Sequence, residues 1–404
     1  MHKHLSRIIQ EFDLFPKALV NVVSAYILYL MLETRGHNAK QASTLMGIPE
    51  SSFSRMLNRP DSLILAKSSL NHAARRRLAA LQRGKRGKRP LVIIDSTLIG
   101  RRGKFVENAS FYRLGKKSIR GHKLINFVLY LDGEIVPLSV VAHYSQAYCE
   151  ENGYTYKTEN ELVIEWLNWL HASNLFARED IKHLNFVCDA GYDAKKVQKA
   201  INRIGCHFTM CIKSNRLIEG QSIEEYFCRQ RIIPWQSIRL FAEKDGKKVR
   251  KEYRIRIASN VQLKGFGPVS AVYSEARKRD GQRSKKYIVS SQTGLSGREI
   301  VENYRNRWAI ESWHKDMKQN HGYSDCRSAC FRAFEAHVNF CLAAYNLQRC
   351  NESGIPRPGI SIAEYVGVRK LQDGAHTLNQ FSGVQRFKKA ASEELGEIVI
   401  TKAA

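Results

Sequence analysis

The sequence predicts a mixed α/β protein in which a sheet-based core lies between a helical N-terminal part and a helical C-terminal part. Apolar residues recur with helical spacing before position 72. Short apolar runs bounded by turn residues, the pattern of strands, begin at Pro90. The chain has 404 residues, and single cores rarely grow beyond about 250 to 300 residues. We therefore expect two or three domains.

The chain is strongly basic, with 65 Lys and Arg against 38 Asp and Glu and a net charge of +27. Such a charge repels itself in a compact protein, so a polyanionic partner is expected, with nucleic acid ahead of an anionic membrane. The most apolar stretch, residues 18–32, is shorter than the roughly 20 residues that span a bilayer. The N-terminus also lacks the features of a signal peptide. We predict a cytoplasmic protein that does not bind membranes.

Nine scattered cysteines are typical of reduced thiols in a cytosol. Cys326 and Cys330, with His321 and His337 nearby, offer an alternative as zinc ligands. Their spacing is loose, which favours buried thiols.

Residues 1–74 are predicted to form a helical DNA-binding domain with a helix-turn-helix at about 38–58. A short helix through Met46 meets Gly47, which can take the left-handed conformation that ends a helix. Pro49 then stands near the start of a second helix. An ordinary helical hairpin is the alternative, but the charge favours DNA. The second helix would present Glu50, Ser51, Ser52, Ser54 and Arg55 outward.

Residues 75–89 are predicted to form a basic linker, because they hold eight basic side chains, no acid and two glycines. Such a segment would follow a phosphate backbone and give salt-dependent affinity without sequence choice. A solvated tether is the alternative. The candidate DNA contacts are Arg75, Arg76, Arg77, Lys85, Arg86, Lys88 and Arg89.

Residues 90–213 are predicted to form the first part of a catalytic core. The strand at 91–99 starts with four apolar residues, which suggests burial on both faces. Asp95 in such a strand is costly unless it is paired or binds a cation. Strands at 123–131 and 134–143 flank an Asp-Gly turn. A helix near 160–172, a strand at 184–189, a helix at 193–203 and a strand at 207–213 follow.

This element order is that of the ribonuclease-H-like fold, in which the first and fourth strands each carry a metal-binding acid. Asp95 and Asp189 fall at those places. Two divalent cations about 3.5 to 4 Å apart can stabilise the attacking and leaving oxygens of a phosphodiester. Mg²⁺ prefers carboxylate ligands, and Mn²⁺ is a possible substitute. Asp193 competes with Asp189, but its place before a helix favours a capping role.

A third acid is predicted on a helix within the second part of the core, residues 296–350. Ser296 and Glu299 form a capping box. At 100° per residue, one face of about 60° then carries Tyr304, Arg307, Glu311 and Lys318. The opposite face carries Ile310, Trp313 and Met317, a predicted packing stripe. A solvated face with a Glu311–Lys318 ion pair is the alternative.

The spacing Tyr-x2-Arg-x3-Glu-x6-Lys of this face, together with the Asp95 strand and the Asp189-Ala-Gly-Tyr-Asp193 box, resembles bacterial insertion-sequence transposases of the DDE class. The subgroup with this signature is the insertion-sequence-four family, and the resemblance covers roughly residues 90–350. It implies that Asp95, Asp189 and Glu311 bind the metal ions. It also implies that Tyr304, Arg307 and Lys318 hold phosphates at the transposon end.

The resembling proteins carry a β-rich insertion before the glutamate helix, and residues 214–295 offer room for one. Strands are predicted at 235–242, 249–258, 269–274 and 287–291. Some relatives stack a tryptophan of this insertion on a flipped base, and Trp235 is the candidate here, with hydrophobic packing as the alternative. The role of the C-terminal region, residues 351–404, is open.

The leading hypothesis is a DNA transposase that cuts at the ends of its element and joins them to target DNA. Its partners would be double-stranded DNA of both kinds and, on DNA, a second copy of the chain in a homodimer. The alternatives are a nuclease of the same fold without strand transfer and a non-catalytic DNA-binding regulator.

Overall fold

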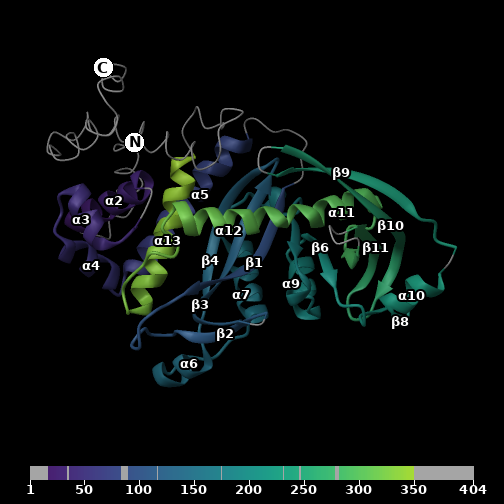
Figure 1. Ribbon diagram of the computed structural model, residues 1–404, viewed down its shortest axis with the longest axis horizontal. Coiled ribbons are helices and arrows are strands. Elements are labelled where there is room, and N and C mark those ends of the chain that lie inside the picture. Colours follow the sequence, from purple (N-terminus) through teal and green to yellow (C-terminus); the bar gives the residue numbers. More distant parts are fainter. Residues whose placement is uncertain are drawn as a thin grey trace, which may run out of the picture.

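The computed structural model describes residues 17–349, apart from 34–35, 83–89, 116, 174, 231, 245–246 and 278–281. In this part of the chain, a twelve-stranded mixed sheet forms the centre of the molecule and helices pack against it (Figure 1). The path through the sheet is β2-β3-β1-β5-β6-β12-β11-β10-β7-β8, with β4 beside β3 and β9 beside β10. The predicted mixed α/β class is therefore confirmed.

The first half of the sheet contains the strands that the sequence predicts for residues 90–213. The chain passes through β1 (Leu91–Gly100), β2 (Ser110–Leu114), β3 (Lys117–Leu131), β4 (Glu134–His143), β5 (Asn185–Cys188) and β6 (His207–Ile212). Strand β1 is antiparallel to β3 and parallel to β5, which is parallel to β6. Helices α6 (Gln146–Asn152), α7 (Glu159–Ala172), α8 (Arg178–Ile181), the 3₁₀ helix η1 (Ala190–Tyr192) and α9 (Lys195–Arg203) fill the connections.

Strand β1 is buried on both faces, as its apolar start predicts. Leu91 and Ile93 belong to one hydrophobic cluster, whereas Val92 and Ile94 belong to a second cluster on the other face. Because successive side chains of a strand point to opposite faces, the odd-numbered residues of β1 face the first cluster. This cluster contains residues of the last helices of the described chain.

The predicted β-rich insertion continues the core sheet. It contains β7 (Leu217–Ile218), β8 (Gln221–Ser222), α10 (Ile223–Arg229), β9 (Gln236–Lys244), β10 (Lys247–Leu263), β11 (Gly267–Arg277) and β12 (Arg283–Ser290). Strand β12 pairs with β6 from Tyr287 to Ser290. This pairing joins the insertion directly to the core.

Three helices follow the insertion: α11 (Gly297–Asn306), α12 (Trp308–Asn320) and α13 (Phe331–Gln348). A single helix was predicted through residue 318, and α11 and α12 instead abut at Arg307. The Arg307 backbone keeps helical dihedrals, φ −51° and ψ −34°. Its N–H donates to the Tyr304 carbonyl three residues back, at 3.2 Å, and its carbonyl accepts from Ile310 at 3.1 Å. The helix therefore changes locally to the tighter 3₁₀ hydrogen-bonding pattern at this residue.

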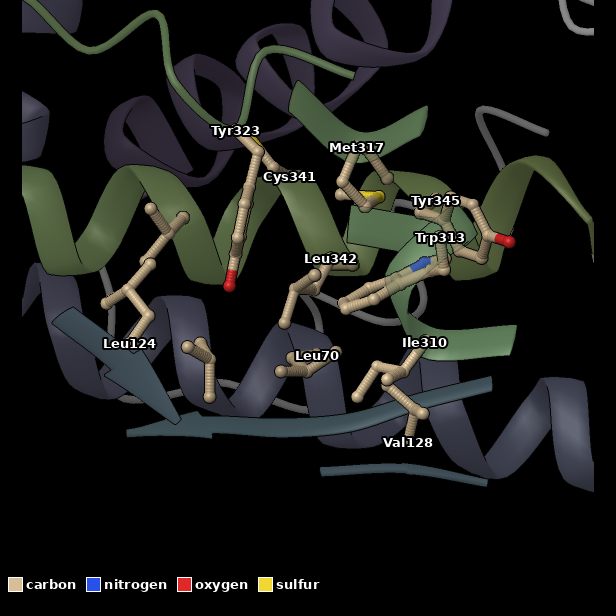
Figure 2. Close-up of a cluster of buried hydrophobic side chains, with 14 of the residues drawn as sticks. Leu70, Leu124, Val128, Ile310, Trp313, Met317, Tyr323, Cys341, Leu342 and Tyr345 are labelled. Carbon is tan, nitrogen blue, oxygen red and sulfur yellow. The ribbon is translucent and has the colours of Figure 1, made fainter. Parts of the chain in front are cut away.

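The apolar stripe of α12 packs as predicted. Ile310, Trp313 and Met317 are each no more than 2% exposed. Figure 2 shows them beside Leu342 and Tyr345 of α13, with Ile310 near Val128 of β3.

Four helices precede the sheet: α2 (Lys17–Leu32), α3 (Ala39–Met46), α4 (Glu50–Asn58) and α5 (Ser62–Gln82). The predicted helix pair is present. Asn38 caps α3, Gly47 ends it at φ 66°, and α4 buries Phe53 together with Met56 and Leu57. None of the described helices is long and apolar enough to cross a bilayer.

The predicted basic linker is wrong for residues 75–82, because α5 continues through them to Gln82. Arg77 is only 4% exposed and pairs with Glu134 of β4, so this side chain stabilises the fold and is no DNA contact. Arg75 is exposed and Arg76 is half-buried. The remaining predicted contacts lie outside the described residues: Lys85, Arg86, Lys88 and Arg89.

The N-terminal helices share one hydrophobic core with α12 and α13, so they do not form a separately tethered unit as predicted. Tyr26 of α2 donates a hydrogen bond to Nδ1 of His337 in α13 at 2.7 Å. The Nε2 atom of the same histidine faces the Gly322 carbonyl at 2.7 Å. The predicted C-terminal region, residues 351–404, lies outside the described residues.

Candidate active site

Asp95 lies in the middle of β1, opposite Asn126 of β3. Its odd number places its side chain on the face that α12 covers, and 15% of this side chain is exposed. Burial raises the pKa of Asp95 to about 6. The positive charge of Arg307 opposes this rise, whereas the negative charges of Asp189 and Glu311 add to it. The three predicted acids therefore interact electrostatically at one place.

Asp189 reaches this place because β5 runs parallel to β1, with Cys188 paired to Ile94. Asp95 directly follows Ile94, and Asp189 directly follows Cys188 at the end of β5. The Oδ1 atom of Asp189 accepts a hydrogen bond from the Gly191 N–H at 2.8 Å and caps the 3₁₀ helix η1. This capping bond fixes the carboxylate at the end of the strand.

Asp193, the competitor of Asp189 in the sequence, is taken up by other contacts. Its buried carboxylate pairs with Arg216 at 3.2 Å and accepts from Gln198 at 3.1 Å and from the Lys213 N–H at 3.3 Å. The expected capping role is wrong, because Ala194 is the N-cap of α9. Asp193 ties α9 to the end of β6, and the preference for Asp189 agrees with this arrangement.

Arg307 connects the glutamate helix to β1. Its guanidinium donates to Glu311 at 2.6 Å and lies 3.5 Å from the carboxylate of Asp95. The arginine side chain is 10% exposed, so its charge is largely shielded from water. The positive charge between Asp95 and Glu311 is therefore the guanidinium of Arg307.

Lys318 and Tyr304 each have a partner of their own, on different strands. Lys318 Nζ donates to Thr97 Oγ1 at 2.7 Å and to the Leu98 carbonyl at 3.0 Å, both in β1. The alternative Glu311–Lys318 ion pair is therefore wrong. Tyr304 is 7% exposed, burial raises its pKa, and Lys286 Nζ lies 4.9 Å from its ring centroid.

Among the described residues, no three His, Cys, Asp or Glu side chains stand in an arrangement that would hold a metal ion. This finding also covers the alternative zinc site at Cys326 and Cys330. The donor set at Asp95, Asp189 and Glu311 still fits a hard divalent cation in its chemistry, since all three are carboxylates. Glu311 would have to leave Arg307 to join the two aspartates on one ion.

Trp235 is partly covered by protein groups. Its side chain is 40% exposed, the Arg254 guanidinium lies 4.6 Å from its ring centroid and Tyr273 lies at 5.5 Å. These contacts agree with the packing alternative for this residue.

Trp308, which the sequence reasoning did not select, is 61% exposed directly after Arg307. With Tyr304, Lys251 and Lys286 it lines a small cavity of about 70 Å³. The sequence does contain a signal for Trp308, because a tryptophan directly follows the signature residue Arg307 and the signature does not account for it.

The helix-turn-helix candidates lie on the surface of α4. Ser51 and Arg55 are exposed and Ser52 is half-buried. The Arg55 guanidinium donates to the Ser51 carbonyl at 3.2 Å, so the two side chains share one outward patch.

Comparison with known proteins adds one finding to this geometry. No curated protein matches the chain. A family model described as "Transposase DDE domain" matches residues 86–347, well over half of the chain. This segment contains all three acids, the whole sheet and most of α13. The chain therefore belongs to the transposase DDE domain family.

Proposed function

We propose that this transposase cuts phosphodiester bonds at the ends of its own DNA element and transfers the 3′-hydroxyl ends to target DNA. The observation that carries the proposal is geometric: the parallel pairing of β1 with β5 brings Asp189 beside Asp95, and the guanidinium of Arg307 contacts both Asp95 and Glu311. The strand order β4-β3-β1-β5-β6 supports a ribonuclease-H-like core. The signature spacing supports membership in the insertion-sequence-four subgroup.

The acids Asp95, Asp189 and Glu311 would together hold two divalent cations, Mg²⁺ or Mn²⁺. When bound, such ions lower the pKa of the attacking hydroxyl and stabilise the leaving oxygen of the phosphodiester. Three converging carboxylates repel one another, and this repulsion is what a divalent cation relieves.

The basic residues of the glutamate helix would act on the phosphates. Arg307 presents a planar guanidinium that can donate hydrogen bonds to two phosphate oxygens as readily as it now holds two carboxylates. The ammonium group of Lys318 is held near the end of β1 by hydrogen bonds to Thr97 and Leu98. A phosphate would replace these neutral partners with an anion. Tyr304, held against Lys286, would pack beside the same strand of DNA.

The outward patch of α4 would enter a DNA groove, with Ser51, Ser52 and Arg55 as the contacts. The exposed side chain of Arg75 would add a phosphate contact. Two element ends joined in one reaction require two active sites, so we expect a homodimer on DNA.

The test compares Asp95→Asn, Asp189→Asn and Glu311→Gln with the wild type on end DNA in Mg²⁺. Each variant should lose strand cleavage and keep DNA binding. Asp193→Asn is the matched control, because this buried acid of the same segment holds Arg216 and should not affect cleavage in folded protein. Full cleavage by any of the three variants would refute the assignment.

Incubation of precut end DNA with a supercoiled target separates the transposase from a nuclease, since only a transposase yields joined products. A non-catalytic regulator would show no metal dependence in either reaction.

A further inference from the structure

A basic arm, residues 101–120, projects from the core next to the candidate active site. It comprises the loop after β1, strand β2 and the start of β3. Strand β2 pairs with β3 alone among the described strands, and Figure 1 shows it below β1. The arm contains seven Lys and Arg residues and a single acid, Glu107, whose carboxylate accepts a hydrogen bond from the Phe331 N–H at 2.7 Å.

Two large aromatic side chains of the arm are exposed to solvent. Phe105 is 82% exposed and Phe111 is 73% exposed. Lys104 Nζ lies 5.7 Å from the Phe105 ring centroid. Exposure of an apolar ring costs free energy in the isolated protein, so two such rings among cations indicate a partner with flat apolar groups and negative charge. Duplex DNA offers both, with apolar groups on the base edges and sugars of its grooves and negative charge on its phosphates.

The arm is rigid where it carries the first ring. Arg120 donates to the Gly103 carbonyl at 2.6 Å and to the Lys104 carbonyl at 3.3 Å, in the two residues directly before Phe105. His122 Nε2 faces the Glu107 carbonyl at 2.9 Å and Asn108 donates to the His143 carbonyl at 3.1 Å. A ring that is held out by such bonds loses little conformational entropy on binding.

The arm faces the same way as the catalytic aspartate. Asn126 of β3 is the partner of Asp95, and Arg120 lies six positions earlier on the same strand. Because residues two apart share a face, Arg120 lies on the face of β3 that carries Asn126. Phe111 is the direct cross-strand partner of Arg120, so it shares this face.

The spacing between the acids and the arm fits a short stretch of duplex. Five residues of β1 separate Asp95 from Gly100, which is about 17 Å at about 3.3 Å per residue. This length corresponds to about five base pairs at 3.4 Å per pair. A cavity of about 480 Å³ lies at the base of the arm, next to Gly100, and its wall includes the exposed Arg102 and Arg327. Exposed basic groups therefore lie at the end of β1 where the arm begins.

We propose that the basic arm binds duplex DNA about five base pairs from the reacting phosphodiester, with Phe105 and Phe111 in a groove against base edges and sugars and Arg113 on a phosphate. The inference rests on the proposed function, because it takes the reacting bond to lie at the acids. The duplex could be the element end or the target, which share this chemistry.

The test measures DNA binding in an Asp95→Asn background, so that the DNA stays intact. The probes are a duplex taken from the DNA that flanks the gene and a duplex of arbitrary sequence, each titrated at several NaCl concentrations. Loss of Phe105 and Phe111 together (Phe105→Ala with Phe111→Ala) should weaken binding by about 10- to 150-fold, the equivalent of burying one phenylalanine side chain, and leave the salt slope unchanged. Arg113→Ala should reduce the salt slope by about 0.9.

Ile232→Ala is the control, because this apolar side chain is 91% exposed outside the arm. All variants should keep the unfolding temperature of their parent, since the substituted side chains lie on the surface. Weaker binding to the flanking duplex alone assigns the arm to the element end, and equal weakening on both duplexes assigns it to DNA of any sequence, target included.

Unchanged affinity of the double phenylalanine variant on both duplexes overturns the proposal. A change in oligomeric state without DNA, with affinity unchanged, would also overturn it and assign the arm to a second copy of the chain. These outcomes are independent of catalysis. Cleavage by Asp95→Asn would refute the proposed function, whereas normal binding by the arm variants would refute only this inference.

Discussion

The guanidinium of Arg307 lies 3.5 Å from the carboxylate of Asp95, although 212 positions separate the two residues. Burial disfavours the charged form of Asp95, and Arg307 is the group that opposes this effect. The glutamate helix thus brings a counter-charge to β1 as well as an acid. The same guanidinium holds Glu311, so one residue contacts two of the three carboxylates.

Arg307→Ala should destabilise the protein by on the order of 3 kcal/mol at pH 8, because it leaves the buried charge of Asp95 without a partner. Without Arg307 the pKa of Asp95 rises further, so the carboxyl is protonated at pH 5.5 and the loss should be smaller there. Urea unfolding at the two pH values measures both losses. Arg298→Ala is the control, because this side chain of α11 is exposed. Equal losses at both pH values would contradict the pairing.

Asp95→Asn should make the protein more stable at neutral pH. The pKa of Asp95 is about 6 in the folded state, above the value of about 3.9 expected in the unfolded chain. Between these values the folded state binds more protons, so the contribution of Asp95 to stability falls as pH rises from about 4 to about 6. The asparagine side chain does not ionise, so the variant does not lose stability in this pH range. We expect a gain on the order of 1 to 3 kcal/mol at pH 7.5 and none at pH 4.

The same variant tests metal binding without any activity assay. Mg²⁺ that binds the folded state should raise the unfolding temperature of the wild type at pH 7.5, and chelation should reverse the rise. Asp95→Asn should show little response to Mg²⁺. A metal-dependent rise of the same size in wild type and variant would place the metal elsewhere.

Lys318→Ala should lower the salt slope of DNA binding by about 0.9, the contribution of one phosphate contact. The lysine is bound to Thr97 and Leu98 in the free protein, so the substitution also removes two hydrogen bonds. Thr97→Val is the matched control, because it removes one of these bonds and keeps the charge. Titrations at several salt concentrations separate the two effects. A wild-type slope for Lys318→Ala would rule out the phosphate role.

Much of this architecture is predictable from local pattern. Gly47 ends α3 in the left-handed conformation, and the turn at Asp132 and Gly133 joins β3 to β4. Helical spacing predicts that Arg307 and Lys318 share one face, and both side chains meet residues of β1, Asp95 and Thr97. These features depend on backbone preferences and helix periodicity, which a short window of sequence contains.

What the window does not contain is the group that each side chain meets. Helical angles bring Glu311 and Lys318 onto one face, yet Glu311 binds Arg307 and Lys318 binds β1, because the strand opposite supplies better acceptors. Arg77 belongs to a basic run that is typical of a linker, and Glu134, 57 positions away, makes it part of the interior. Long-range partners of this kind decide between a DNA contact and a structural ion pair.

The last prediction concerns the junction between the N-terminal helices and the glutamate helix. His37 is fully buried, and both its backbone N–H and its Nδ1 atom face the Asp325 carboxylate at 3.0 Å. Asp325 lies just after α12. Burial acts to raise the pKa of Asp325, but the hydrogen bonds from His37 outweigh it and hold the pKa below its usual value. The pair therefore stabilises the fold at neutral pH, and this contribution is lost as pH falls through the folded pKa.

Asp325→Asn should therefore destabilise the protein at pH 7 and have little effect in strong acid, where the wild-type carboxylate is also protonated. Because α2 shares its core with α13, we expect one cooperative unfolding transition for the described chain and no separate melting of α3 and α4. Hydrogen exchange should speed up in residues 38–58 and in α12 together when the pair is broken. Faster exchange in α3 and α4 alone would mean that the helix pair moves independently of the glutamate helix. Under the proposed function, DNA bound by α4 would then not be held at a fixed distance from Asp95.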